Sequence, residues 1–310
     1  MSSIGLSILL HETEHPPPPG HPENCERLRL IAGELSARTD FAPLDGPPVD
    51  LDQLYRVHHR DYIDRLIRLV SQGSGNVDAD TYYGPDSVQA ARIVSGNALK
   101  AVDMAFGNGP RVAFILGRPP GHHAEAGRGM GFCLVNHAAV AAQYAIDEYH
   151  LKRVAIFDFD VHHGNGTQDI FYDRADVLYV STHQHPFYPG TGAASERGAS
   201  DGEGYTINYP LPPGMDDSTY CGLMNDEVVP ALSDFNPEYI VVSAGFDGHG
   251  LDPLGGFHLT GRTYHHIATS LVRVAEEKCH GRILALLEGG YEDRGNLDAI
   301  SSFISGLEQS

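Results

Sequence analysis

The amino-acid sequence predicts an α/β fold in which helices cover both faces of a central parallel sheet. Two observations lead to this prediction. Short apolar segments of strand length alternate along the 310 residues with longer segments of helical periodicity. The strand segments are also apolar on both faces, as in the interior of a parallel sheet. No internal repeat or shift in composition divides the chain, so we expect one domain over residues 1–310.

The predicted elements follow one another in the order of βαβ units. The strand segments are rich in β-branched residues and lie at residues 4–10, 112–116, 154–159, 177–181, 239–244 and 283–287. The helical segments lie at residues 24–37, 62–70, 87–106, 136–149, 220–235 and 263–278. Because helices separate most of the strands, the strands are expected to run parallel.

Composition and charge exclude several classes of protein. The chain has 41 acidic and 21 basic side chains, a formal charge of −20, so no basic surface for nucleic acid or for an anionic membrane is expected. No segment approaches the ~20 apolar residues of a membrane span. The four cysteines are widely spaced, which indicates a reducing, cytoplasmic location. The oligomeric state stays open, a homo-oligomer included.

Histidine, aspartate and tyrosine collect immediately after four of the predicted strands. The segments are RPPGHHAE at residues 118–125, DFDVHHGNG at 158–166, SAGFDGH at 243–249 and EGGY at 288–291. In an open α/β sheet the carboxyl ends of the strands form the edge at which ligands bind. We therefore expect a functional site there.

One of these segments has the spacing of half a metal site. Asp158, Asp160 and His162 stand at i, i+2 and i+4, so an extended chain points all three to one side. The alternative is a buried carboxylate that a neighbouring histidine satisfies. Asp247 would supply a third ligand if its strand is a neighbour, and three protein ligands with an open fourth position are typical of catalytic zinc.

Two further groups could act beside such a metal. His122 and His123 follow a Pro-Pro-Gly turn and offer a general base, although histidines in turns are often surface residues or helix caps. Tyr291 follows Gly289 and Gly290 and could stabilise an oxyanion, or could simply pack on the turn. Neither a G-x-S-x-G elbow nor a phosphate-binding glycine loop is present, which leaves metal-assisted hydrolysis.

These motifs resemble the zinc-dependent histone deacetylase superfamily, which includes acetylpolyamine amidohydrolases and bacterial deacetylase-like amidohydrolases. They occur in family order from about residue 21 to residue 291. Asn165, where class I members carry Asp, resembles class II, as do DPL at 252–254 and LEGGY at 287–291. The other matching motifs are RPPGHHAE at 118–125, GFC at 131–133, DFDVHHGNGTQ at 158–168, YVS at 179–181, YPG at 188–190, AGFD at 244–247 and DPLGG at 252–256.

The resemblance implies an arginase-like fold with a central parallel sheet of about eight strands. It implies one Zn²⁺ held by Asp160, His162 and Asp247. It also implies that Asp158 accepts a hydrogen bond from His122, orienting and charging it, and that Asn165 pairs with His123 as a neutral partner. It further implies a structural K⁺ and a substrate tunnel. The K⁺ ligands would come from Asp158, Asp160, His162, Ser181 and Thr182, and the tunnel from Gly131, Phe132, Tyr188 and Leu254. Tyr188 stands where many relatives have phenylalanine, which leaves the acyl-chain preference open.

The activity expected from the resemblance is removal of acetyl or other acyl groups from N-acyl-lysine side chains or acetylated amines. His123 would take a proton from the attacking water, Tyr291 would donate to the oxyanion, and a histidine would protonate the leaving amine. Hydroxamate inhibitors are expected to bind. An acetylpolyamine amidohydrolase and a non-catalytic acyl-lysine-binding protein are alternatives. A binuclear manganese ureohydrolase is disfavoured, because it needs a carboxylate where Gly164 stands.

Overall fold

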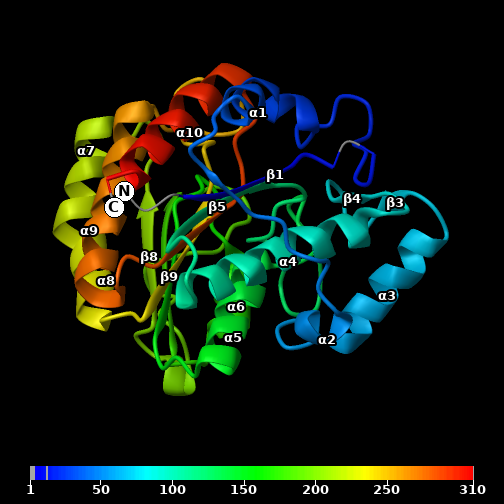
Figure 1. The fold of residues 1–310 in the computed structure, drawn as a ribbon, viewed down its shortest axis with the longest axis horizontal. Coiled ribbons are helices and arrows are strands. Elements are labelled where there is room, and N and C mark those ends of the chain that lie inside the picture. Colours follow the sequence, from blue (N-terminus) through cyan, green and yellow to red (C-terminus); the bar gives the residue numbers. More distant parts are fainter. Residues whose placement is uncertain (1–3, 12, 310) are drawn as a thin grey trace.

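The fold is an eight-stranded, all-parallel sheet with helices on both faces (Figure 1). A computed structural model describes residues 4–11 and 13–309. The order across the sheet is β2 (Ala42–Pro43), β1 (Gly5–Leu9), β5 (Val112–Gly117), β10 (Ile283–Leu287), β9 (Tyr239–Ala244), β6 (Val154–Asp158), β7 (Val177–Gln184) and β8 (Thr206–Leu211). A short antiparallel pair, β3 (Gly75–Asn76) and β4 (Tyr82–Tyr83), lies apart from it. The predicted fold class is confirmed.

Alternate residues of each central strand point into two separate hydrophobic cores. In β5, Phe114 belongs to one core, whereas Ala113 and Ile115 belong to the other. The same alternation in β9 sends Ile240 to the first core and Val241 to the second. Because both faces of the sheet are buried, these strands are apolar on both sides.

The two cores lie under two groups of helices (Figure 1). The first core is covered by α1 (Arg29–Ser36), α7 (Asp217–Leu223), α8 (Val229–Phe235), α9 (Gly261–Cys279) and α10 (Asp293–Leu307), with the 3₁₀ turn Cys25–Leu28 and the π-helical turn Met224–Val228. The second core is covered by α2 (Leu51–Leu54), α3 (Arg60–Ser71), α4 (Ser87–Phe106), α5 (His137–Tyr149) and α6 (Asn165–Phe171). A further 3₁₀ turn spans Ser200–Gly202. Among the described residues, no helix has both the length and the apolarity needed to cross a membrane.

The structure adds elements that the sequence pattern did not predict. β8 lies at the sheet edge with half-exposed residues and Pro210, so it lacks the two-faced apolar pattern of a central strand. α10 contains Gly295 and Gly306, and glycine weakens helix propensity. α2 and α6 are four and seven residues long, too short for a helical period to be recognised.

Candidate active site

The four strands followed by polar motifs are neighbours in the sheet. β5, β10, β9 and β6 stand side by side in that order, so their carboxyl ends open at one edge. His122 and His123 come from the loop after β5, and Asp160 and His162 come from the loop after β6. The loop after β9 carries Asp247, and the loop after β10 carries the turn that ends at Tyr291. Parallel topology therefore brings together segments that are spread along the chain from residue 118 to residue 291.

Asp160, His162 and Asp247 form a cluster with the spacing of a metal site. One ligand atom from each lies within 4.8 Å of the others. Nδ1 of His162 is 3.1 Å from Oδ1 of Asp160 and 3.0 Å from Oδ2 of Asp247. Both carboxylates are almost completely buried, so they need a positive charge between them.

Backbone amides hold the two carboxylates in place. The N–H of Gly289 donates to Oδ2 of Asp160 over 2.8 Å, and the N–H of Val161 donates to Oδ1 of Asp247 over 2.9 Å. A Cβ at position 289 would lie 2.1 Å from Oδ2 of Asp247, so only glycine allows the turn after β10 to approach this closely. Outer contacts of this kind orient the ligands of a metal.

The protonation of the cluster also fits a cation. Burial lowers the pKa of His162, but hydrogen bonds to Asp160 and Asp247 outweigh burial and raise it to about 10. Burial and the charge of Asp160 raise the pKa of Asp247 to about 7. Two carboxylates thus compete for one positive charge on His162. A divalent ion with a preference for N and O ligands would satisfy all three groups, and this donor set fits zinc.

The paired histidines lie in opposite electrostatic environments, although they are adjacent in the chain. Nδ1 of His122 lies 3.0 Å from Oδ2 of Asp158, whereas Nδ1 of His123 lies 2.8 Å from Oδ1 of Asn165. Burial lowers the pKa of His122, but the charges of Asp158 and Asp160 outweigh it and raise that pKa well above the usual value. Burial and the neighbouring cationic imidazoles lower the pKa of His123 well below the usual value. His122 is therefore the charged member and His123 the neutral one, a separation typical of acid–base sites.

A pocket of about 220 Å³ leads to this cluster. It is lined by His123, Gly131, Phe132, His162, Tyr188, Leu254 and Tyr291, with Asp80 and Phe187. All four residues predicted for the tunnel wall line it. Asp80 and Phe187 were not predicted, because neither belongs to a motif with its own chemistry. The ring of Phe187 stacks on His162 with centroids 5.1 Å apart.

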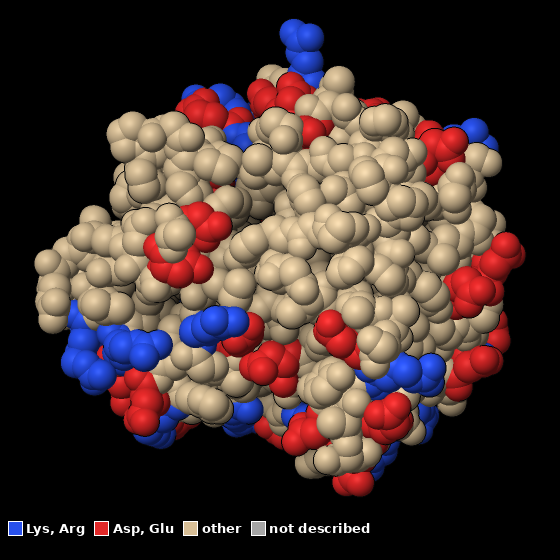
Figure 2. Space-filling view, turned by 180° about the vertical axis from the view of Figure 1, so that it is seen from behind, with Lys and Arg blue, Asp and Glu red and all other residues tan. Residues whose placement is uncertain are grey.

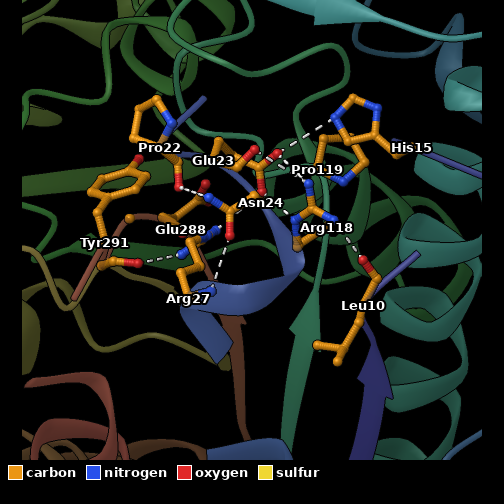
Figure 3. A network of polar contacts seen from close by, with 12 residues as sticks. Leu10, His15, Pro22, Glu23, Asn24, Arg27, Arg118, Pro119, Glu288 and Tyr291 are labelled. Atoms are coloured by element: carbon orange, nitrogen blue, oxygen red, sulfur yellow. Dashed lines mark hydrogen bonds and ion pairs between the residues drawn. The ribbon is translucent and has the colours of Figure 1, made fainter. Parts of the chain in front are cut away.

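Tyr291 is held at the pocket by contacts to its backbone and its ring. Its N–H donates to Oδ2 of Asp252 over 2.5 Å, and the guanidinium of Arg27 lies 5.1 Å from the centroid of its ring. Arg27 also donates hydrogen bonds to the backbone carbonyl oxygens of Gly290 over 2.7 Å and Glu288 over 3.0 Å. These two bonds hold the turn that precedes Tyr291 (Figure 3). Burial raises the pKa of Tyr291 well above 10, so its hydroxyl remains a hydrogen-bond donor.

Glu288 holds the loop after β5, which carries His122 and His123, through hydrogen bonds to its backbone. Its Oε2 accepts hydrogen bonds from the backbone N–H groups of Gly121 over 2.7 Å and His122 over 3.0 Å. Burial raises the pKa of this carboxyl to about 7. Glu288 is part of the LEGGY motif, but nothing in the sequence indicates that it contacts the loop after a different strand.

A buried ion pair between Glu23 and Arg118 connects the N-terminal segment to the same loop (Figure 3). Both side chains are completely buried. Nη2 of Arg118 donates to Oε2 of Glu23 over 2.7 Å, and the hydroxyl of Tyr82 donates to the same oxygen over 2.9 Å. Nη1 of Arg118 donates to the carbonyl oxygen of Leu10 over 2.7 Å. Nothing in the sequence indicates this network, in which Glu23 and Arg118 are 95 positions apart.

Replacing one member of this pair is expected to destabilise the fold. Glu23→Gln leaves the guanidinium of Arg118 buried without a counter-charge, which should lower the free energy of unfolding by about 3–5 kcal/mol. Urea denaturation followed by circular dichroism measures this. Glu26→Gln is the matched control, because Glu26 pairs with Arg29 at the surface and its loss should have little effect. Equal effects of the two substitutions would contradict the prediction.

The residues expected to bind K⁺ lie beside the cluster. Asp158 and Ser181 are register partners in β6 and β7, and Thr182 is the next residue along β7. The hydroxyl of Ser181 lies 2.9 Å from Nδ1 of His183, and that of Thr182 lies 2.5 Å from the hydroxyl of Tyr220. Asp158 also accepts a hydrogen bond from the hydroxyl of Tyr179 over 3.1 Å.

Comparison with known proteins finds the same family by sequence and by structure. The histone deacetylase domain family matches residues 21–307. A probable deacetylase of Archaeoglobus fulgidus is 38% identical over 297 residues, which cover 94% of this chain and 82% of that protein. A histone deacetylase-like amidohydrolase of Pseudomonas aeruginosa is 38% identical and covers 88% and 73% of the two chains. The crystal structure of the HDA15 HD domain superposes with a TM-score of 0.93 at 37% identity, covering 100% of this chain and 89% of that one.

Proposed function

This chain belongs to the histone deacetylase family, and on that premise we propose that it is a zinc-dependent, class II-like deacylase of N-acyl-lysine side chains or acetylated amines. It is a hydrolase that acts on amides, as its named relatives are. The observation that carries the proposal is the pocket whose inner wall combines His162 of the carboxylate–imidazole cluster with neutral His123 and Tyr291.

Asp160, His162 and Asp247 would hold the zinc ion. When bound, it would polarise the amide carbonyl and lower the pKa of a water molecule. Because His123 contacts Asn165 through Nδ1, its Nε2 is the nitrogen left to accept the proton of the attacking water. The charged imidazole of His122 remains paired with Asp158.

Tyr291 would stabilise the transition state, because its hydroxyl would donate a hydrogen bond to the carbonyl oxygen as that oxygen becomes negative. The C–N bond then breaks, a histidine returns a proton to the leaving amine, and acetate and the free amine depart. Asp252 has a supporting part, because it binds the N–H of Tyr291 and also accepts from the N–H of Leu254 over 2.9 Å.

Acyl-lysine is our first choice of substrate class. The net charge of −20 favours cationic molecules but is not gathered in one place on the face drawn in Figure 2, where acidic and basic side chains lie in small interspersed clusters. Among the residues that the structure describes, Asp80 is the carboxylate that lines the pocket. It would attract a peptide amide or an ammonium group, and an acetylpolyamine amidohydrolase is therefore the alternative.

A binuclear ureohydrolase arrangement fits the cluster poorly. It requires a carboxylate at position 164, where a Cβ on the present backbone would lie 2.0 Å from Oδ2 of Asp158 and 2.6 Å from the hydroxyl of Tyr179. Elemental analysis of the purified protein should therefore give one zinc per chain.

We also propose a K⁺ ion held by Asp158, Asp160, His162, Ser181 and Thr182. Elemental analysis after dialysis against sodium buffer tests whether the protein retains this ion. The cytoplasmic location and the extent of the domain over residues 1–310 stay predictions.

The test of the function is parallel turnover of an acetyl-lysine peptide, acetylputrescine and a trifluoroacetyl amide, each with and without a hydroxamate. We expect hydrolysis that the hydroxamate abolishes, with the acetyl-lysine peptide turned over fastest. Faster turnover of acetylputrescine would select the polyamine alternative. A zinc-loaded protein that hydrolyses none of a wide acyl-lysine panel would instead be the non-catalytic acyl-lysine binder.

A further inference from the structure

A chain of polar contacts extends outward from His123 to the surface. His123 contacts Asn165, Asn165 contacts Glu125, and Glu125 is paired with Arg128. We infer that Glu125 is a positioning residue for the general base, because it sets the orientation of the Asn165 amide and thereby the tautomer of His123. This inference rests on the proposed function, in which His123 is the base.

The amide of Asn165 has one orientation that satisfies all its neighbours. Its Nδ2 donates to Oε1 of Glu125 over 2.8 Å and lies 3.3 Å from Sδ of Met130, while its Oδ1 faces Nδ1 of His123 over 2.8 Å. A carboxylate and a thioether sulfur can only accept hydrogen bonds. If the amide turned over, its oxygen would meet the carboxylate of Glu125, and two acceptors would repel each other.

The orientation of Asn165 determines which nitrogen of His123 carries the proton. An amide oxygen only accepts, so Nδ1 of His123 must be the donor, and in a neutral imidazole Nε2 then carries the lone pair. A carboxylate partner imposes this tautomer by itself, as Asp158 does for His122. An amide can present either its oxygen or its nitrogen, so Asn165 imposes the tautomer only while Glu125 holds it.

Arg128 pairs with the carboxylate of Glu125 from the solvent side. Its Nε donates to Oε2 over 2.7 Å and its Nη2 to Oε1 over 2.8 Å, a bidentate pair. The Arg128 side chain is 61% exposed, whereas that of Glu125 is 21% exposed. The ion pair balances the charge of Glu125, but Asn165 does not contact the arginine. Removal of Arg128 therefore separates the effect of the ion pair from that of the amide contact.

The first experiment compares Glu125→Ala, Glu125→Gln and Arg128→Ala in the zinc-loaded protein. Glu125→Ala should lower kcat about tenfold with KM within about twofold, because only part of the contribution of a general base is lost. Glu125→Gln keeps an acceptor oxygen for Asn165, so its kcat should stay within about threefold of the wild-type value. The kcat of Arg128→Ala should stay within the same range, because the contact between Glu125 and Asn165 remains. An Arg128→Ala effect as large as that of Glu125→Ala would overturn the inference.

The tautomer is measured directly from the ¹⁵N shifts of the histidine rings, with the His123 signals identified by their loss in His123→Gln. The wild type and Arg128→Ala should show His123 protonated at Nδ1 alone, and Glu125→Ala should show both tautomers. Retention of the Nδ1–H tautomer in Glu125→Ala would overturn the inference. This readout needs no turnover, so it tests the inference even if the substrate panel shows no hydrolysis and the proposed function fails.

A double-mutant cycle with Asn165→Asp tests the direction in which Glu125→Ala changes kcat. A carboxylate at position 165 imposes the tautomer unaided and is repelled by Glu125, so Glu125→Ala in that background should raise kcat instead of lowering it. This outcome also excludes misfolding as the cause of the loss in the single variant. A decrease in kcat of the same size in both backgrounds would overturn the inference.

Discussion

Asp247→Ala is expected to abolish both zinc binding and amide hydrolysis. Asp247 is fully buried, its Oδ2 lies 3.0 Å from Nδ1 of His162, and it is one of two carboxylates in the cluster. Without it, Asp160 and His162 are two ligands, fewer than the three of a catalytic zinc site. Loss of the ion removes several kcal/mol of transition-state stabilisation, so kcat/KM should fall by about 10³ or more.

Elemental analysis and turnover of the acetyl-lysine peptide measure the two effects together. Asp201→Ala is the matched control, since it removes an exposed carboxylate of the 3₁₀ turn Ser200–Gly202 that does not belong to the cluster. Both variants should retain the circular dichroism spectrum of the wild type. Full activity with bound zinc in Asp247→Ala would show that the metal ligands are other residues.

Tyr291→Phe is expected to lower kcat by about 10²–10³ while zinc content stays at one ion per chain. The substitution removes only the hydroxyl, and the backbone contact to Asp252 and the packing of Arg27 on the ring can both remain. A donor that acts on the developing oxyanion contributes more to the transition state than to the ground state. The loss should therefore be found in kcat and much less in KM.

The matched control for this variant is Tyr205→Phe. Tyr205 packs against Phe235 near the β8 edge of the sheet and does not line the pocket. Steady-state kinetics on the acetyl-lysine peptide should separate the two variants by at least about 10² in kcat. If Tyr291→Phe retained the wild-type kcat, the oxyanion donor would have to be another group.

Much of the fold could be predicted from the sequence because the sheet interior is apolar on both faces. All six predicted strands correspond to β1, β5, β6, β7, β9 and β10, within a few residues at each end. β7 is longer than predicted and continues to Gln184, because Thr182, His183 and Gln184 are polar yet buried. Edge strand β8 and helix α10 were missed because half-exposed strands and glycine-containing helices have weak local patterns.

The set of residues at the site could also be predicted. Parallel strands end at the same edge of a sheet, so polar motifs after β5, β6, β9 and β10 must meet there. The supporting residues could not be predicted in this way. Arg27, Glu125, Asp252 and Glu288 act through contacts to backbone groups or to another amide, and such contacts depend on how loops from different strands meet.

The sequence by itself thus determined the order of the strands along the chain, the chemistry at their ends and the family. The family resemblance implied that Asp158 pairs with His122 and Asn165 with His123, and the tertiary structure shows what these contacts do to the protonation of the two imidazoles. His122 and His123 are neighbours in the chain, yet their pKa values shift in opposite directions, because one faces Asp158 and the other faces Asn165. Desolvation and Coulomb interaction depend on distances in space, and no local pattern of residues encodes them.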